Sequence, residues 1–406
     1  MSKKNKNPIK FLRATKFFEI VKERSRRFKA GSTKPIPKEY PVNELARRLH
    51  PVIQKVKISR VEEQCPDCKT YTLVPDTENG TEELAYFSSG QYISVFLQIN
   101  GLNFTRPYSL SSAPKESLNG KDGFYQITIK AAKGGLVSNY IIENWKVGDE
   151  ITVSGPEGHF DYVYLRDAPT VIGVAGGSGI TPFLSYVKSL VNGDEDFNLI
   201  LLYGSRDKKS ILFKDQLDDL EKKSDKIKIV HVLSNEDSVS EGFEKGFISA
   251  DLIKKYAPKG PYSIFLCGPQ AMYNFVDKEI ESLGLEKKFI RHEMFGEIHS
   301  GKSQKNYPGS QSPEVTITVT IRDQTFTVKG STDDTIMQIL EKGGVTVPNR
   351  CRSGECGWCH SLLKKGQVWV PQKMDFRRKA DYKFNFIHPC CTFALSDLEL
   401  DVPPAK

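Results

Sequence analysis

The sequence predicts a multidomain protein in which an antiparallel β-barrel is followed by an α/β domain with a parallel sheet and then by a smaller domain around a cysteine cluster. The first reason is size, because 406 residues with 38% hydrophobic content exceed one core and can fill several interiors. The second is a change near residue 165, where strand-only runs give way to alternating strands and helices. The third is that five of the eight cysteines lie after residue 350.

Residues 51–164 are predicted to form the barrel, because short β-branched or aromatic runs alternate there with turn residues. The runs are VIQKVKISRVEE, KTYTLVPDT, QYISVFLQI, GFYQITIKAA and DEITVSGPEG. The pair CPDC (65–68) falls in the first hairpin. Since no βαβ pattern surrounds it, we interpret it as a structural turn rather than a redox dithiol.

Residues 165–297 are predicted to form the α/β domain. The apolar runs APTVIGVAGG, FNLILLYGS, KIKIVHVLS and YSIFLCGP alternate with helical stretches such as ITPFLSYVKSLV, and this order is typical of a parallel sheet with helices on its faces. Residues 298–313 have no apolar periodicity and are predicted to be a linker. Residues 314–406 then form a compact, strand-rich domain.

Residues 1–50 form a basic extension. Residues 1–60 hold eighteen Lys or Arg against four Glu, a balance of +14, so the net charge of +8 leaves about −6 for the rest. An apolar stripe at helical spacing predicts an amphipathic helix, formed by Phe11, Ala14, Phe18, Val21 and Phe28. Three interpretations stay open: docking on its own domain, contact with a partner or an anionic membrane surface, and a disordered basic tail.

Several classes of protein are excluded by the composition. No apolar run reaches the roughly 20 residues of a membrane-spanning helix, and the N-terminus lacks the apolar core of a signal peptide. The cysteine pattern is not a secreted disulfide framework. We expect a cytoplasmic protein, with peripheral association at the inner membrane face as an alternative, and no nucleic-acid partner, because nothing resembles a reader of bases.

The stretch GVAGGSGITP (173–182) follows a predicted strand and opens a helix. Glycines there let the backbone approach a pyrophosphate, and the N–H groups of the helix N-terminus favour an anion. Alone this pattern is weak, since glycine turns between strands and helices are common. The other motifs of the chain decide how this one is interpreted.

Five motifs in order, RPYSLSS (106–112), GGLVSNY (134–140), GPEGHF (155–160), GGSGITP (176–182) and CGPQAMY (267–273), make the chain resemble the ferredoxin–NADP reductase flavoprotein family. With the cluster domain at its C-terminal end, it is similar to the phthalate dioxygenase reductase and phenylacetyl-CoA oxygenase reductase subfamily. The resemblance covers about residues 51–406. It implies that the last domain is an α+β, β-grasp ferredoxin domain.

The resemblance implies a flavin site in the barrel. Arg106 would neutralise the flavin phosphates, Tyr108 would pack on the isoalloxazine ring, and Ser109 would bond near N5. The loop sequence favours FAD over FMN. The residues expected to bind flavin are Arg106, Pro107, Tyr108, Ser109, Leu110, Gly135, Leu136, Val137 and Ser138.

The resemblance also implies a nicotinamide site, with Ser109, Cys267 and Phe295 closest to the chemistry. The residues expected to bind NADH or NADPH are Gly176, Gly177, Gly179, Thr181, Ser205, Arg206, Cys267, Gly268 and Pro269. Ser205 and Arg206 could bind a 2′-phosphate, whereas Asp207 would repel it if it faced the ribose. Cys267 could equally be a plain buried thiol. The choice between NADH and NADPH stays open, with NADPH slightly favoured.

The spacing Cys351-x4-Cys356-x2-Cys359 is typical of plant-type [2Fe–2S] sites, which need a distant fourth cysteine. Cys390 and Cys391 are both candidates, and the family alignment favours Cys390. The alternative is zinc held by four cysteines. A flavin and nicotinamide module favours iron, because it gives a redox-active cluster an electron source.

The expected activity follows from electron counting. A nicotinamide gives two electrons as hydride and a [2Fe–2S] cluster takes one at a time, so a flavin must stand between them. The acceptor is external, either a protein such as an oxygenase component or, as the alternative, an anaerobic system with a quinone, a metalloenzyme or a corrinoid protein. A binding or sensing protein without catalysis is a third hypothesis, which the intact cofactor motifs disfavour.

Overall fold

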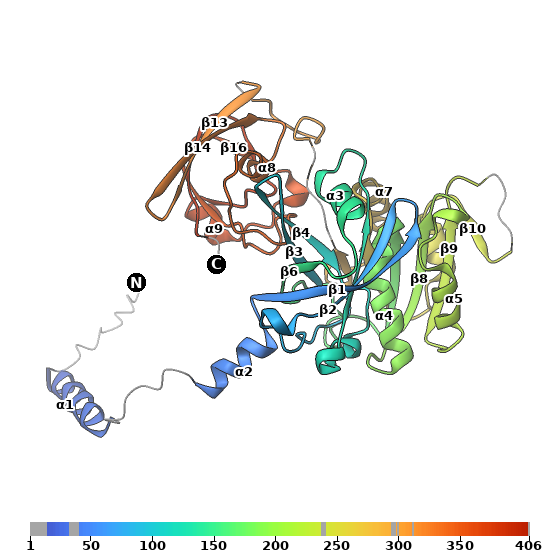
Figure 1. Cartoon of the computed structure of the whole chain (residues 1–406), viewed down its shortest axis with the longest axis horizontal. Coiled ribbons are helices and arrows are strands. Elements are labelled where there is room, and N and C mark those ends of the chain that lie inside the picture. The colour runs from blue at the N-terminus through green and yellow to red at the C-terminus, as the bar shows by residue number, and fades with distance from the viewer. Residues whose placement is uncertain are drawn as a thin grey trace, which may run out of the picture. The chain divides into compact units, whose positions relative to one another are not determined.

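The computed structural model describes residues 14–31, 40–236, 241–293, 298, 300–310 and 312–404. The chain divides into two compact units, Met1–Ala46 and Arg47–Lys406. Phe295, a predicted site residue, lies outside the described residues. The N-terminal region contains α1 (Ala14–Ala30) and α2 (Pro41–Leu49), so the predicted basic helix is present (Figure 1).

The first sheet of the large unit is antiparallel, as predicted, and has the strand order β4-β3-β6-β1-β2-β5. Its elements are β1 (Ile53–Cys65), β2 (Cys68–Pro75), η1 (Thr77–Asn79), β3 (Tyr92–Ile99), β4 (Leu102–Ser109), η2 (Pro114–Leu118), η3 (Gly120–Asp122), β5 (Tyr125–Lys130), α3 (Leu136–Asn144) and β6 (Glu150–Ser154). A bridge between Leu110 and Ile127 brings the β4 end back to β5. The sheet therefore curls into a half-open barrel around a core that includes Val56, Leu73 and Ile93.

The second sheet is parallel throughout, as predicted, with the order β10-β9-β8-β7-β11-β12. Its elements are β7 (Thr170–Gly176), η4 (Gly177–Ile180), α4 (Thr181–Asn192), β8 (Asn198–Ser205), η5 (Lys208–Ser210), α5 (Lys214–Glu221), β9 (Ile227–Leu233), β10 (Phe243–Lys245), α6 (Ala250–Tyr256), β11 (Ser263–Cys267), α7 (Gln270–Glu281), η6 (Lys287–Phe289) and β12 (Ile290–Glu293). Two cores cover its faces, one with side chains of α4 and α5 and the other with side chains of α6 and α7.

The C-terminal domain has a five-stranded sheet in the order β14-β13-β19-β15-β17 and a two-stranded sheet β16-β18. Its elements are β13 (Glu314–Ile321), β14 (Gln324–Ser331), α8 (Ile336–Lys342), β15 (Ser361–Lys365), β16 (Val368–Trp369), η7 (Gln372–Met374), α9 (Lys379–Lys383), β17 (Phe386–Ile387), β18 (Phe393–Ala394) and β19 (Leu398–Asp401). The only parallel pairing here among the described strands is β13 with β19, and α8 packs beside β14. This is the predicted α+β, β-grasp arrangement.

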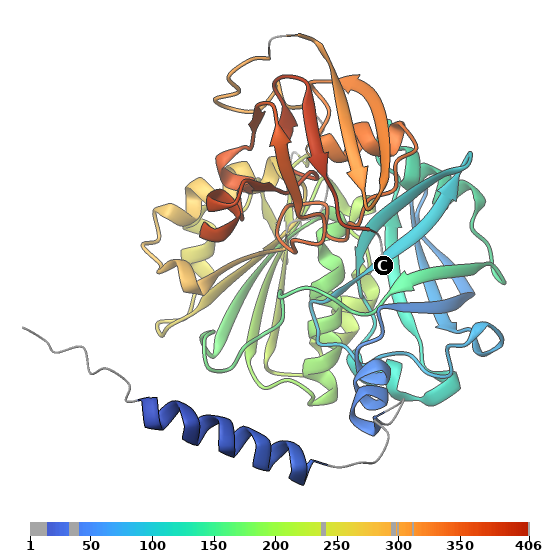
Figure 2. The same ribbon diagram turned by 90° about the vertical axis from the view of Figure 1, so that its left-hand side faces the viewer.

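Within the large unit, the C-terminal domain (orange to red) contacts both other domains (Figures 1 and 2). Asn103 of β4 donates to Thr346 over 2.9 Å, and Arg350 donates to Glu157 over 3.0 Å. Lys373 reaches Asp277 of α7 over 3.0 Å. In the described part of the chain, no helix combines the length and apolarity that crossing a membrane requires. The exact domain borders stay predictions.

Candidate functional site

The flavin-binding residues predicted at positions 106–110 lie at the end of β4, a surface that we call the flavin wall. Ser109 pairs with Tyr92 of β3, and Leu110 donates its backbone N–H to Gln91 over 2.9 Å. Pro107 and Ser109 are buried, whereas Tyr108, on the alternate face of the strand, packs against the barrel core. Burial raises the pKa of Tyr108, so its phenol stays neutral and suits contact with an aromatic ring.

The N-terminus of α3 is suited to a pyrophosphate. Gly135 is the N-cap, no side chain caps the helix, and its first turn has no acidic residue. A Cβ at Gly135 would lie 2.9 Å from both Ala132 Cβ and Ser138 Oγ, so only glycine allows this turn. Val137 is buried while Leu136 is 54% exposed. The first N–H groups of α3 therefore fit the anionic part of FAD.

Arg106, predicted to bind the flavin phosphates, has another anionic neighbour. Its Nη1 donates to Thr105 O over 2.8 Å and lies 3.3 Å from Glu341 Oε1 of α8. Arg352 lies in the loop that carries Cys351, Cys356 and Cys359, which we call the cluster loop. It donates to the same carboxylate, with Nη2 2.9 Å from Oε2. Burial raises the pKa of Glu341 to about 7, and Arg106 opposes this rise. The phosphate role of Arg106 stays a prediction.

A cavity of about 620 Å³ lies at the carboxyl ends of β7 and β8. Its wall contains Gly176, Gly177, Ser205, Arg206 and Pro269 of the predicted nicotinamide site. The hydroxyl of Ser205 is buried without a hydrogen-bond partner among the described residues, as expected for a group that awaits a ligand. The cavity fits a dinucleotide in position, size and donor set.

Three further predicted residues shape the loops after β7 and β11. A Cβ at Gly179 would lie 2.2 Å from Cys267 O, and one at Gly268 would lie 2.2 Å from Met272 Cε. Thr181 Oγ1 donates to Ser178 O over 3.0 Å at the start of α4. The glycines therefore let the two loops close on each other beside Cys267.

Asp207 does not face the cavity. Its carboxylate accepts from Ser210 N over 2.9 Å and caps η5. The charged residues in the cavity wall are Lys130 and Arg206, both cations. The carboxylate of Asp207 is therefore engaged in capping η5 and is not part of the cavity wall.

Glu293 is a site residue that the sequence reasoning missed. It ends β12 directly opposite Cys267 and is 4% exposed, and its Oε1 has no hydrogen-bond partner among the described residues. Burial raises the pKa of the Glu293 carboxyl and of the Cys267 thiol well above their ordinary values. Burial therefore favours the protonated form of both groups. The available signal was its position two residues before Phe295.

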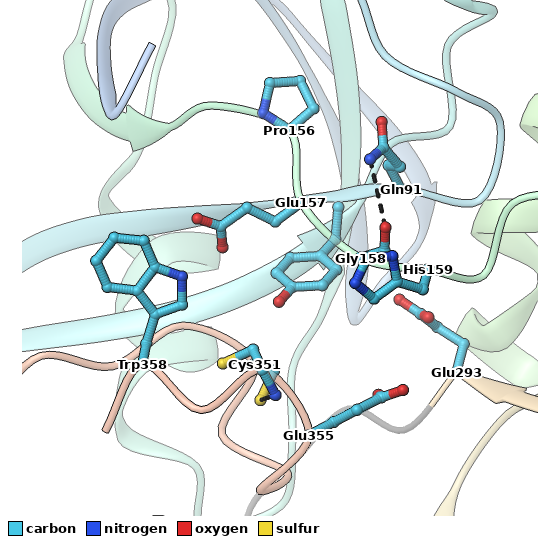
Figure 3. A pocket seen from close by; sticks show the side chains of 11 residues that line it. Gln91, Pro156, Glu157, Gly158, His159, Glu293, Cys351, Glu355 and Trp358 are labelled. Atoms are coloured by element: carbon cyan, nitrogen blue, oxygen red, sulfur yellow. Dashed lines mark hydrogen bonds between the residues drawn. The ribbon is translucent and has the colours of Figure 1, made fainter. Parts of the chain in front are cut away.

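The cluster loop faces the barrel across a cavity of about 280 Å³ (Figure 3). Cys351 and Trp358 line it from the loop, and Tyr92, Glu157 and Glu293 line it from the other two domains. Burial raises the pKa of Glu157 to about 7 against the opposing effect of Arg350. This cavity brings the cluster loop, the flavin wall and the nicotinamide domain to one place.

The four predicted ligands converge. Cys359 Sγ lies 3.4 Å from Cys390 Sγ, and the thiols of Cys356 and Cys390 interact with Cys351 and hold its pKa well below the ordinary value. Among the described residues, no three His, Cys, Asp or Glu groups are placed to hold a single metal ion. Cys351, Cys356, Cys359 and Cys390 supply the four thiolates that a plant-type [2Fe–2S] cluster requires.

Backbone donors and glycines shape the cluster loop. The N–H groups of Ser353 and Cys356 point to Cys351 Sγ over 3.5 and 3.4 Å, a contact that favours the more negative, reduced state of a thiolate-bound cluster. Gly354 and Gly357 have positive φ of 87° and 74°. Cys391 is buried and donates to His388 O over 3.5 Å.

The CPDC pair is part of a hairpin turn. Cys65 and Cys68 are opposite partners at the end of the β1–β2 pairing, as the turn interpretation requires. Cys65 Sγ donates to Asp67 over 3.0 Å. Burial raises the pKa of Cys68 to about 12, which makes it a poor nucleophile.

Three family models match the chain in the predicted order. They describe an oxidoreductase FAD-binding domain at residues 55–162, an oxidoreductase NAD-binding domain at 174–278 and a 2Fe-2S iron-sulfur cluster binding domain at 319–395. The chain therefore has FAD, NAD(P) and [2Fe–2S] as its cofactors, and it is an NAD(P)H-dependent oxidoreductase.

Relatives have the same organisation. The chain is 25% identical to the glycine betaine monooxygenase reductase subunit of Pseudomonas aeruginosa, over 85% of this chain and 94% of that one. It is 26% identical to the ferredoxin reductase component of 3-ketosteroid-9-alpha-monooxygenase of Rhodococcus rhodochrous, over 84% and 94%. The solved structure of phthalate dioxygenase reductase is 25% identical with a TM-score of 0.59, over 86% of this chain and 98% of that one. The chain is thus a flavin and iron–sulfur reductase of the ferredoxin–NADP reductase superfamily with a C-terminal ferredoxin domain.

Proposed function

We propose that this reductase is the electron-supplying component of an oxygenase system, passing electrons from NAD(P)H to a separate oxygenase protein. One observation carries the proposal: the ferredoxin domain packs against the flavin barrel in the same chain, through Glu341 of α8 with Arg106 and through Arg350 beside Cys351 with Glu157. A cluster held beside the flavin serves as the exit for single electrons. The two relatives named above are, by their names, reductase parts of monooxygenases, which favours an oxygenase as acceptor.

When bound, the flavin converts a two-electron hydride donor into single electrons for the cluster. The residues of this chain supply the binding and the protons. The turn before α3 and the loop after β7 bind the two anionic groups with backbone N–H donors. The Glu293 carboxyl lies opposite Cys267 on the neighbouring strand, and burial raises the pKa of both groups well above their ordinary values, which favours their neutral forms at this end of the domain.

The basic N-terminal helix is proposed as a second contact. Phe18, Val21 and Phe28 of α1 are exposed, and the helix carries Lys and Arg on its remaining surface. An apolar stripe with dense positive charge suits an acidic acceptor surface or an anionic membrane.

The test uses the holoenzyme and an oxygenase component encoded beside its gene. Anaerobic addition of NADPH or NADH should give the EPR signal of a reduced [2Fe–2S] cluster, and the oxygenase should then be reduced at the expense of that signal. Cluster reduction without any transfer to the oxygenase would refute the oxygenase role, and a quinone or another metalloprotein would replace it as the acceptor.

A further inference from the structure

The two sides of the cluster loop have different surroundings. Cys351 and Cys356 line the cavity that faces the barrel, so they lie on the side where electrons enter. Cys359 and Cys390 lie 3.4 Å apart and are buried outside that cavity. Residues 372–388, which contain η7, α9 and β17, lie next to them, since Met374 packs in the same buried core as Cys359 and Cys390. An acceptor that approaches the cluster from this side meets that segment.

This segment is fixed to the cluster loop at two points. His360, next to Cys359, lies 2.8 Å from Asp381 of α9 and stacks on Phe386 with ring centroids 4.0 Å apart. His388 Nδ1 lies 2.6 Å from Gly354 O. The stacked pair of His360 and Phe386 gives a short, packed path from the ligand Cys359 towards the surface. The segment is therefore a rigid part of the cluster site.

The outer surface of the segment is aromatic and positively charged. Phe376, Tyr382 and Phe384 are 41%, 56% and 58% exposed. Three exposed cations, Arg378, Lys379 and Lys383, lie in the same segment. We call the six residues together the basic aromatic face: Phe376, Arg378, Lys379, Tyr382, Lys383 and Phe384. Single exposed aromatics are ordinary, but these three fall within nine residues of a segment that contacts the cluster loop, and exposed aromatic side chains are enriched at interaction sites.

The acidic residues of the segment do not cancel this charge at the surface. Asp381 is buried and accepts from Arg378 N over 2.7 Å in addition to His360. Asp375 binds the guanidinium of Arg377 over 2.8 and 2.6 Å and accepts from the Tyr382 hydroxyl over 2.7 Å. Both carboxylates are used to hold the segment together, so Arg378, Lys379 and Lys383 determine the charge that a partner meets.

We propose that the basic aromatic face is the docking surface for the electron acceptor, and that the acceptor presents an acidic surface with an apolar centre around its own redox group. The inference rests on the proposed function and adds the partner's chemistry and the place where it binds. Charge complementarity would steer the encounter, and the three aromatic rings would supply the apolar contact at its centre. The partner that binds the basic aromatic face is not the basic helix α1, because both are positively charged.

The experiment uses two haem proteins as acceptors, acidic cytochrome b5 and basic cytochrome c. The test variant is Arg378→Glu/Lys379→Glu/Lys383→Glu, and the matched control is Lys329→Glu/Lys364→Glu/Lys365→Glu, three exposed lysines on β14 and β15 of the same domain. Reduction of cytochrome b5 by the wild type should slow as salt rises. The test variant should lower its kcat/KM at low salt about 10-fold or more and remove the salt dependence.

Cytochrome c should react in the opposite direction, faster with the test variant than with the wild type. Phe384→Ser should raise KM for cytochrome b5 with kcat unchanged. In every variant the EPR signal of the NADPH-reduced cluster and the reduction of menadione, a neutral small acceptor, should match the wild type. These two readouts report the internal electron path, so a failure of the proposed reductase function is distinguished from a failure of the docking surface.

Two results would overturn the proposal. One is equal loss of cytochrome b5 reduction in the test and control variants, which would show a general effect of charge. The other is unchanged cytochrome b5 reduction in the test variant together with lost binding to phosphatidylserine vesicles, which would assign the face to a membrane.

Discussion

Arg106 of the flavin barrel and Glu341 of the ferredoxin domain form an ion pair, with Nη1 and Oε1 3.3 Å apart. Glu341 is also bound by Arg352, a fully buried residue of the cluster loop. The Glu341 carboxylate thus binds one guanidinium from the barrel, that of Arg106, and one from its own domain, that of Arg352. Removing one member of such a buried set leaves uncompensated charge, which is strongly destabilising.

Glu341→Gln should change the pH dependence of stability. Burial raises the pKa of Glu341 to about 7 in the folded protein, above its ordinary value of 4.5. Between these values the folded state binds more protons than the unfolded state, so stability falls as pH rises from about 4.5 to about 7. The stability advantage of the wild type over the variant should therefore shrink across this window, by up to about 3 kcal/mol.

Urea unfolding followed by cluster absorbance at pH 5, 6, 7 and 8 measures this difference. Exposed Glu314→Gln is the control for replacing a carboxylate by an amide in the same domain. A wild-type advantage that grows from pH 5 to pH 8 would contradict the prediction, because it would mean that the two guanidinium groups outweigh burial.

The sequence predicts the cofactor sites better than it predicts the contacts between domains. Cys351, Cys356 and Cys359 lie within one loop, so their spacing indicates a metal site, and the flavin and nicotinamide motifs upstream favour iron over zinc. Arg106 and Glu341 are 235 residues apart, and nothing local to either position marks the other as its partner. Glu293 lies between these cases: its place two residues before Phe295 was readable, but its strand and its burial opposite Cys267 depend on the packing of the whole parallel sheet.

Cys390→Ser should abolish or strongly alter the EPR signal of the reduced cluster, because Cys390 Sγ lies 3.4 Å from Cys359 Sγ. Flavin absorbance and NAD(P)H-driven ferricyanide reduction should survive. Cys391→Ser is the matched control and should change little, since Cys391 Sγ is directed at His388 O. A lost signal in the Cys391 variant and a normal one in the Cys390 variant would reverse the assignment.

Arg106→Ala should weaken retention of FAD. It removes a charge-assisted contact worth roughly 1.5–3 kcal/mol, or about 10- to 150-fold in affinity, as equilibrium dialysis of the flavin would measure. Glu341→Gln keeps Arg106 and serves as the comparison. If both variants lose FAD equally, the effect comes from the interdomain contact rather than from the phosphates. Extraction of FMN from the wild type would refute the choice of FAD.

Arg206→Ala should raise KM for NADPH about 10-fold or more and leave KM for NADH nearly unchanged, because a charge-assisted contact of roughly 1.5–3 kcal/mol to the 2′-phosphate would be lost. Arg206 lines the cavity while Asp207 caps η5. Lys209→Ala is the control, since Lys209 is outside the cavity wall. Equal effects on the two coenzymes would show that Arg206 does not recognise the 2′-phosphate.

Deleting residues 1–40 should separate the internal reaction from docking by the basic helix. The deletion removes α1 but keeps α2, whose Arg48 pairs with Glu83 over 2.5 Å. Ferricyanide reduction should stay near wild type, because both redox domains remain. Turnover with the physiological acceptor should fall and lose much of its salt sensitivity, since screening acts on charge-guided encounters.

A charge-only variant distinguishes the two parts of this contact. Lys22→Ala/Arg24→Ala/Lys29→Ala keeps the exposed rings of Phe18 and Phe28 and removes three exposed cations of α1. It should reproduce the lost salt sensitivity with a smaller loss of turnover at high salt, where the apolar stripe still contributes. If the shortened chain is insoluble or loses FAD, residues 1–40 belong to the packing of the barrel, and the docking role of α1 is wrong.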